Sequence, residues 1–475
     1  MTVDVVVVGG SLAALVAAAD LAEAGQDVTM VKPGGAWGGY FAGFKVGDLT
    51  FDAGMVMLEF TAFAQQAGIG DIGSYDPAVR NDVGRFASVV QDWAASRFST
   101  REISPLSMQI GGEILPDLIM GNDLAALTRL PFADATLAQL RSMPTVTSLH
   151  AREKARGEAY ETCGFEAASR ANHGDLFHDR LMAPFLSKVL GPHAEHLLAR
   201  YHRIPWLPLY WPATLQAVLE GDKPPFDPSP LEYPVGSTVA GVVAALTSSL
   251  QGSSRVRMMD GVPIRLRPGN PGSLLELADG SILDARHLAW THTPAALIQA
   301  LGETPELASL RRAPLALALL TVPRHEARAT FSVLQVVDPE FGLYRVTDLD
   351  VCAGSQNGMS RWVVEFNLQV FEARYGLADT DDQVLGQVVL ELQKLGLIAA
   401  PEVVSTMVLK RIPGGFAVPD QESLRVWRSE RATIDRLAPG IDLMGATSGF
   451  MVTSLNDQVV QGLKFSRKVQ DALAT

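Results

Sequence analysis

The sequence predicts an α/β fold whose first element is a strand of a parallel sheet. Residues 3–8 are almost all valine, which is typical of a strand buried on both faces. Residues 12–24 are rich in alanine and leucine at helical spacing, Gly25 is placed to end that helix, and residues 28–31 return as a second strand. A strand, a glycine turn, a helix and a strand within about 30 residues form the βαβ unit of a Rossmann-like, dinucleotide-binding domain.

Length and composition narrow the class of protein. A chain of 475 residues predicts two or more domains, and a net charge of −13 without a basic cluster argues against a nucleic-acid partner. The longest strongly apolar run, residues 313–322, is well short of the ~20 residues that cross a bilayer, so we expect no transmembrane segment and a cytoplasmic location. Cys163 and Cys352 stand far apart without zinc-ligand spacing, so we expect two reduced thiols and no metal.

The glycine turn holds the positions that would cradle a pyrophosphate. The free N–H groups and the positive dipole end of a helix attract phosphate, and glycine lets the backbone come close. The usual G-x-G-x-x-G pattern is altered, with serine at its second glycine and alanine at its third. The serine Cβ would crowd a phosphate, although its hydroxyl could donate a hydrogen bond. The six positions are Gly9, Gly10, Ser11, Leu12, Ala13 and Ala14.

Lys32 ends the second strand, where a carboxylate normally accepts hydrogen bonds from a ribose. A lysine cannot accept. It could face a 2′-phosphate or point into solvent, and the sequence leaves both open.

The segments after this unit resemble the flavin-containing amine oxidase and phytoene desaturase superfamily. Residues 37–40, Trp-Gly-Gly-Tyr, match the paired glycines that follow the first βαβ unit there, and residues 51–54, Phe-Asp-Ala-Gly, match a segment that lies beside the flavin. We expect Asp52 to pin a turn rather than to take part in catalysis. The resemblance implies FAD as cofactor and adds Pro33, Gly38, Gly39, Tyr40, Gly54 and Met55 to its predicted contacts.

The centre and the C-terminal end carry the same resemblance. Residues 253–294 read as a strand, a β-hairpin and a returning strand, and Val262 matches a family position whose backbone contacts the adenine. Residues 441–473 resemble the closing motif, in which a helix begins at the flavin's pyrimidine edge. Ser454 and Asn456 are candidate N-caps of a helix from about residue 457. The predicted contacts here are Gly445, Ala446 (at the family's acid position), Ser454, Leu455 and Asn456.

Residues 151–220 resemble the helical insert of the branch that contains protoporphyrinogen oxidase and UDP-galactopyranose mutase. Aromatic and cationic side chains are interleaved in it, and these could line a substrate cleft, although at helical spacing aromatics more often belong to the core. The substrate candidates are Tyr201, Arg203, Trp206 and Tyr210, with Phe416 and Phe450 from later segments. His173 and His178 are possible acid–base groups, and no catalytic residue is assigned.

The sequence contains no internal repeat and no low-complexity linker that would separate two consecutive domains. We therefore expect the domains to be interleaved in the sequence. We predict a Rossmann-like FAD-binding domain with a β-hairpin extension from residues 1–60, 233–300 and 436–475, and an α+β substrate domain with the helical insert from residues 61–232 and 301–435.

The expected function is an FAD-dependent oxidoreductase that takes hydride from a C–N or C–C bond of a small molecule, with a homo-oligomer possible. Two alternatives stay open: a mutase or isomerase acting on a sugar nucleotide, and a cofactor-depleted protein with a non-redox role. If Lys32 faces the adenosine ribose, Lys32→Glu should strengthen FAD retention.

Overall fold

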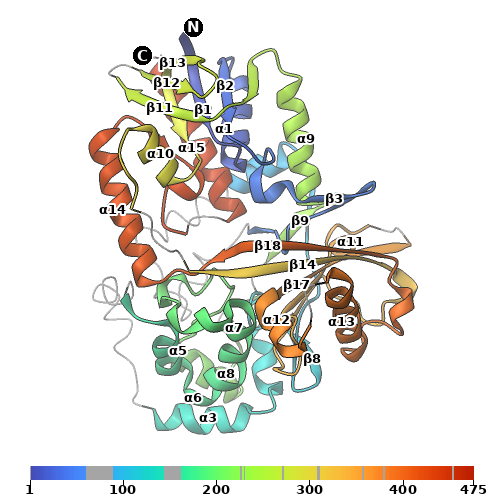
Figure 1. Cartoon of the computed structure of the whole chain (residues 1–475). Helices are drawn as coiled ribbons and strands as arrows, with labels where there is room; N and C mark the ends of the chain where they lie inside the picture. Colours follow the sequence, from blue (N-terminus) through green and yellow to red (C-terminus); the bar gives the residue numbers. More distant parts are fainter. Residues whose placement is uncertain are drawn as a thin grey trace.

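The computed structural model describes residues 2–59, 89–143, 162–224, 227–228, 230–269, 272–306, 311–355, 358–377, 380–451 and 454–474. Two sheets form its framework (Figure 1), one near the chain ends and one below it. The α/β fold with a parallel sheet, a hairpin extension and a second, α+β part is confirmed. Among the described helices none is long and apolar enough to cross a membrane.

The first sheet has the order β10-β2-β1-β13-β12-β11, with β19 beside β13. Its first four strands are parallel, and β11 and β12 form an antiparallel hairpin on β13. The four valines at residues 5–8 of β1 are fully buried, because α1, α9 and α15 cover one face of the sheet, and the hairpin side chains and α10 cover the other. The strands are β1 (Thr2–Val8), β2 (Val28–Lys32), β10 (Val256–Asp260), β11 (Pro263–Pro268), β12 (Ser273–Leu277), β13 (Ile282–Trp290) and β19 (Asp442–Leu443).

Helices from both ends of the chain pack together on this sheet. A Cβ added at Gly462 of α15 would lie 2.7 Å from the carbonyl oxygen of Ala13 in α1, so the two backbones approach as only glycine allows. Ser466 of α15 donates to Asp20 of α1 at 2.6 Å. The contact therefore fixes the C-terminal helix against the N-terminal βαβ unit. The helices are α1 (Leu12–Glu23), α9 (Val239–Gln251), α10 (Pro294–Ala300), α14 (Gln421–Leu437) and α15 (Leu455–Ala474).

The second sheet has the order β18-β14-β17-β16-β15-β7-β8. Alternate residues of β14 point to opposite faces, as a strand requires. Leu315, Leu317 and Leu319 join the core shared with the helical insert, whereas Ala316 and Ala318 pack under α13. The elements are β7 (Leu106–Ile110), β8 (Glu113–Pro116), β14 (Arg312–Pro323), β15 (Val333–Val336), β16 (Arg345–Asp348), β17 (Met359–Asn367), β18 (Thr406–Ala417), α11 (Leu349–Cys352), α12 (Leu368–Tyr375) and α13 (Asp381–Lys394).

The helical insert lies below the second sheet (Figure 1). Its helices are α3 (Ala133–Ser142), α5 (Phe165–His173), α6 (Asp175–Phe177), a π-helical turn His178–Met182, α7 (Ala183–Leu190) and α8 (Pro212–Leu219). Short strands connect the two parts: β3 (Phe44–Val46) with β4 (Leu49–Phe51), and β9 (Leu231–Pro234) between β5 (Leu58–Glu59) and β6 (Thr100–Glu102).

Two sequence expectations about these elements are wrong. The sequence pattern of residues 60–150 is largely helical, with a loop over residues 102–117, yet residues 100–116 form β6, β7 and β8. The turn of Gly111 and Gly112, with φ of 63° and 78°, closes the β7–β8 hairpin. The apolar pattern of residues 361–371 predicts a strand over the whole segment, yet β17 ends at Asn367, because this side chain accepts from the Val370 N–H and begins α12. The predicted segments at 60–88 and 144–161 lie outside the described residues.

A buried lysine joins the helical insert to the second sheet. Lys188 of α7 is 3% exposed, and its Nζ donates to the carbonyls of Val336 at 3.0 Å and Leu343 at 3.4 Å. Burial lowers the pKa of Lys188 to about 7. The folded protein thus releases this proton near neutral pH, whereas the unfolded chain holds it to about pH 10.

Stability should therefore rise with pH between 7 and 10, where the unfolded state binds the extra proton, by at most about 1.4 kcal/mol per pH unit. We expect the thermal midpoint of the wild type to rise from pH 7.5 to 9.5, and that of Lys188→Met to rise less. Lys394→Met, at an exposed lysine paired with Glu340, is the matched control. Equal pH dependence in wild type and Lys188→Met would contradict the assignment.

Candidate functional site

The N-terminus of α1 is the centre of the predicted cofactor site. Ser11 caps the helix, with its Oγ accepting from the Ala14 N–H at 3.2 Å. Gly9 has φ of +113°, and a Cβ there would lie 2.2 Å from Thr291 Oγ1, so the chain can turn here only with glycine. The Ala13 N–H donates to Gln458 Oε1 of α15 at 3.3 Å. The turn predicted from the sequence is thus present, and the last helix contacts it.

Two further predicted segments converge on Ser11. The Gly38 N–H donates to the Gly10 carbonyl at 2.7 Å, and Gly38 forms a parallel bridge with Ser11. A Cβ at Gly39 would lie 4.0 Å from the Ser11 Cα, and one at Gly445 would lie 3.5 Å from the Ser11 Oγ. Backbone of two other segments, around Gly39 and Gly445, therefore lies next to the glycine turn at positions where a side chain would project toward Ser11.

The start of α15 is held by its own polar side chains. The Asp457 N–H donates to Ser454 Oγ at 3.1 Å, so Ser454 caps the helix as expected. Asn456 instead binds the backbone of Glu59, accepting from its N–H at 3.1 Å and donating to its carbonyl. The Gly445 N–H donates to Gln461 Oε1 at 2.5 Å. Leu455 is buried, and Ala446 lies in the short 3₁₀ turn Gly445–Thr447.

Gln458 and Gln461 were not predicted. Both contact backbone N–H groups of the site, and their spacing of three residues puts them on one face of the helix. Two glutamines three residues apart near the start of a helix were the sequence signal that could have identified them.

Lys32 does not point into solvent, which corrects one of the two sequence alternatives. Lys32 is only 8% exposed. Its Nζ donates to the Gly35 carbonyl at 2.6 Å and forms an ion pair with Asp260 Oδ1 at 2.8 Å. The Nζ also lies 5.3 Å from the centre of the Trp37 ring. A Cβ at Gly10 would meet the Lys32 Cδ at 2.9 Å. Lys32 therefore covers the glycine turn and holds the loop that contains Pro33.

Asp52 has a structural role, as expected, but acts on a distant helix rather than on its own turn. Its Oδ1 accepts from the Ala240 N–H at 2.7 Å in the first turn of α9, and Tyr233 donates its hydroxyl to Oδ2. Thr238 caps the same helix. Burial raises the pKa of Asp52 to about 6. The Phe-Asp-Ala-Gly segment thereby anchors α9 beside α1.

A buried ion pair lies next to Gly54 and Met55. Glu365 Oε1 accepts from the Met55 N–H at 2.9 Å, and its Oε2 pairs with Arg345 Nη1 at 3.0 Å. A Cβ at Gly54, whose φ is +100°, would lie 2.9 Å from the Tyr40 hydroxyl and 3.3 Å from Glu365 Oε2. Tyr40, Gly54 and the carboxylate of Glu365 therefore lie close together beside β17, an interior strand of the second sheet.

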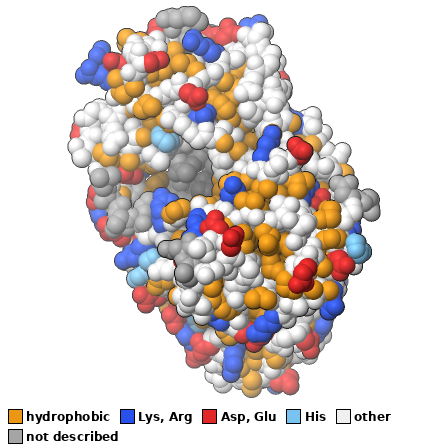
Figure 2. All heavy atoms as spheres, turned by 45° about the vertical axis from the view of Figure 1, so that its right-hand side comes forward, with side chains coloured by type: hydrophobic (Ala, Val, Ile, Leu, Met, Phe, Trp, Pro, Cys, Tyr) orange, Lys and Arg blue, Asp and Glu red, His pale blue; other side chains and the backbone are white. Residues whose placement is uncertain are grey.

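Tyr40 lies partly at the surface of the molecule. Its surface is 47% open, yet desolvation of its hydroxyl, with the Glu365 charge nearby, raises its pKa above the ordinary value. Figure 2 shows the surface hollowed between the upper and lower parts of the molecule. The sequence reasoning missed Glu365 and Arg345. A charged residue inside each apolar strand pattern, "RWVVEFN" and "LYRVT", was the signal.

Two of the predicted substrate residues are brought together. The rings of Tyr201 and Phe450 meet edge to face with centroids 4.9 Å apart, and Trp427 of α14 adds a third ring 6.1 Å from Phe450. Phe416 lies on β18, paired in register with Ala313, and is half-buried.

The other candidates lie in the helical insert. The Arg203 guanidinium stacks over Trp206 with 5.1 Å to the ring centre. Tyr210 is fully buried and donates its hydroxyl to the Leu118 carbonyl at 2.7 Å. His173 is also fully buried, its Nε2 accepts from the Tyr210 N–H at 2.8 Å, and burial lowers its pKa to about 3. Burial lowers the pKa of His178 too. These positions place Tyr210 and His173 in the packing of the insert.

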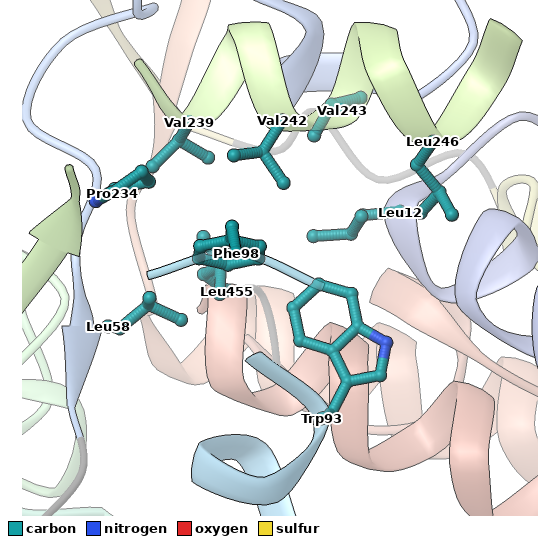
Figure 3. Close-up of a pocket in the computed structure, with 10 residues that line it drawn as sticks. All are labelled: Leu12, Leu58, Trp93, Phe98, Pro234, Val239, Val242, Val243, Leu246 and Leu455. Atoms are coloured by element: carbon teal, nitrogen blue, oxygen red, sulfur yellow. The ribbon is translucent and has the colours of Figure 1, made fainter. Parts of the chain in front are cut away.

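An apolar pocket lies between α1, α9 and α15 (Figure 3). Leu12 and Leu455 line it, together with Val239 and Val243 of α9 and the Trp93 ring. Its open space of about 10 Å³ holds no more than about one water. A larger cavity of about 640 Å³, lined by Arg311, Arg425 and Arg428 among others, lies between α14 and the insert. Among the described residues none of the predicted site residues lines it.

No protein-family model matches the chain, and no curated protein matches it. Solved structures do match. The structure of reduced UDP-galactopyranose mutase has a TM-score of 0.70 at 15% identity and covers 99% of this chain and 96% of that chain. A protoporphyrinogen oxidase-like protein of Exiguobacterium sp. 255-15 has a TM-score of 0.63 at 15% identity, with 99% of both chains covered. Cyclohexylamine oxidase of Brevibacterium oxydans IH-35A has a TM-score of 0.58 at 13% identity over both whole chains. The resemblance inferred from the sequence is thereby confirmed for the fold.

The Asp52 contacts generate a stability prediction. Asp52→Ala removes the acceptor from the Ala240 N–H and leaves the buried Tyr233 hydroxyl unpaired, which should cost about 2–4 kcal/mol of unfolding free energy. Asp52→Asn should cost less, because the amide oxygen can still accept from Ala240.

The pH dependence of folding stability tests the raised pKa of Asp52. The Asp52 carboxyl has a pKa of about 6 in the folded protein and near 4 in the unfolded chain. The folded state therefore binds this proton more tightly, and the resulting stabilisation is complete below pH 4 and is lost as the pH rises through 6. The wild type should therefore gain in thermal midpoint over Asp52→Asn when the pH is lowered from 7 to 5. A difference that stays constant with pH would contradict the raised pKa.

Proposed function

We propose that the chain is an FAD-dependent oxidoreductase that takes hydride from a C–N or C–C bond of a small molecule. One observation carries the proposal: backbone around Gly10, Gly39 and Gly445 converges on the N-terminus of α1, as a dinucleotide site at the carboxyl ends of parallel strands requires. The fold shared with oxidases and with a mutase supports a flavoenzyme.

The residues present fit such a cofactor. Gly39 and Gly445 add no side chain of their own in front of Ser11, and at both positions φ is positive, which suits glycine. The half-exposed Tyr40 and the exposed Val262 lie on segments assigned to the two ends of the cofactor. We assign the pyrophosphate to residues 9–14, the adenine to Val262 and the flavin ring to Tyr40, Gly54, Met55 and the start of α15.

FAD bound there would supply the hydride acceptor. The protein's own contribution would be orientation and a fixed electrostatic environment. The Glu365 carboxylate holds the Met55 backbone and is itself held by Arg345, so the charge next to Tyr40 stays in place. The aromatic group of Tyr201, Phe450 and Trp427 offers an apolar surface that would exclude water from a substrate.

A second candidate is rearrangement of a sugar nucleotide without net oxidation. The TM-score of 0.70 with UDP-galactopyranose mutase favours it. Oxygen consumption distinguishes the two: an oxidase consumes O₂ with turnover of an amine or of a C–C substrate, whereas a mutase needs reduced flavin and consumes none.

The cofactor assignment predicts the effect of one added methyl group. Gly39→Ala places a Cβ in the space facing Ser11, so the affinity for FAD should fall at least about tenfold, equivalent to about 1.4 kcal/mol. Gly376→Ala is the matched control: its φ of +61° is close to the +58° of Gly39, and no atom lies within 4 Å of the added Cβ. The affinities of both variants for FAD can be measured by titrating the protein into FAD and monitoring the flavin fluorescence.

Saturable binding of one FAD per chain, and a flavin absorbance that dithionite bleaches, are the expected wild-type results. Failure of the purified wild type to bind added FAD would overturn both enzyme candidates. An equal loss of affinity in Gly39→Ala and Gly376→Ala would instead indicate that backbone strain, not the site, is responsible.

A further inference from the structure

The carboxylate that the second strand lacks lies on the neighbouring strand. β10 runs parallel to β2, and Asp260, the last residue of β10, pairs in register with Lys32, the last residue of β2. Adjacent strands are about 4.8 Å apart, so Asp260 stands one strand away from the position where a ribose-binding acid is expected. Both strands present their carboxyl ends at the same edge of the sheet.

We propose that Asp260 accepts the hydrogen bonds of the adenosine ribose hydroxyls, taking the role of the missing acid at position 32. The proposal rests on the proposed binding of FAD and names a specificity-determining residue of that site. Asp260 is suited to a ligand because its side chain is 80% exposed although Oδ1 is paired with Lys32. A carboxylate has about four lone-pair directions, so one ion pair leaves acceptors for a ribose diol.

The backbone after Asp260 is fixed in place. The Gly261 N–H donates to the Lys32 carbonyl at 2.9 Å, and the Val262 carbonyl accepts from the Ala278 N–H at 2.9 Å. Val262 is the position assigned to the adenine, and it is 51% exposed. An acceptor for the ribose and a contact for the base are therefore two residues apart on one rigid segment.

Lys32 takes the part of a positioning residue. Its ammonium lies between Asp260 and the Gly35 carbonyl, and its stem covers Gly10, so it is already committed to protein acceptors. A 2′-phosphate on the ribose would meet the negative charge of Asp260 before it met Lys32. The site should therefore prefer a free 2′-hydroxyl over the 2′-phosphate that the sequence left open as a partner of Lys32.

The arrangement reverses the sequence-based expectation for position 32. Lys32→Glu would place two carboxylates side by side on paired strands and remove the cation between them. The affinity for FAD should fall in this variant rather than rise.

The test compares the affinities of wild type and variants for FAD, riboflavin and ADP-ribose. Asp260→Asn should weaken FAD and ADP-ribose at least about tenfold, because a hydrogen bond to a charged acceptor is lost, and should leave riboflavin, which has no adenosine, unchanged. Asp260→Glu should restore part of the loss. Wild type should bind ADP-ribose more tightly than ADP-ribose 2′-phosphate.

Asp27→Asn is the matched control. Asp27 forms an exposed ion pair with Arg255, 3.0 Å long, at the opposite end of the same two strands, so it reports on the loss of a surface pair alone. Unchanged FAD affinity in Asp260→Asn, with wild type binding FAD normally, would overturn the ribose assignment and leave the proposed function standing. Tighter binding of the 2′-phosphate would also overturn it. A wild type that binds neither FAD nor ADP-ribose would instead remove the proposed function.

Discussion

The close packing of α15 on α1 is the contact on which the candidate site depends. Gly462 lets the two helix backbones approach, and α15 then brings Gln458 to the Ala13 N–H and Gln461 to the Gly445 N–H. Asn456, in the first turn of the same helix, holds the backbone of Glu59. A larger side chain at position 462 would separate the helices, and the segments that surround Ser11 would lose their common support.

Local patterns sufficed for the parts of the fold that local physics decides. The valine run, the alanine-rich helix and the hairpin extension were predictable, because burial on both faces and turn chemistry leave strong marks in a short window. The β7–β8 hairpin was missed although Gly111 and Gly112 mark its turn, because its strands are stabilised by β15, more than 200 residues later in the sequence. Residue type alone could not reveal that partner.

The candidate site was likewise predictable only in part. Glycine positions were predictable from spacing, whereas the partners of charged side chains were not. Lys32 was recognised as a departure, but its partner Asp260 is set by the register of β10 on β2. Glu365 and Arg345 meet only because β16 and β17 are adjacent. Tyr210 and His173 looked like site residues by composition and are buried instead, since aromatic and imidazole groups serve equally well in a core.

The interleaved order of the chain has a consequence for biosynthesis. The parallel sheet takes strands from residues 2–8, 28–32, 256–290 and 442–443, and α15, which supports the glycine turn, is completed only at Ala474. A ribosome that adds residues from the N-terminus exposes the glycine turn first and the helix that supports it last. The nascent βαβ unit therefore lacks the contacts of Gly462, Gln458 and Ser466 until more than 400 further residues have been added, so the glycine turn takes its final support late in synthesis.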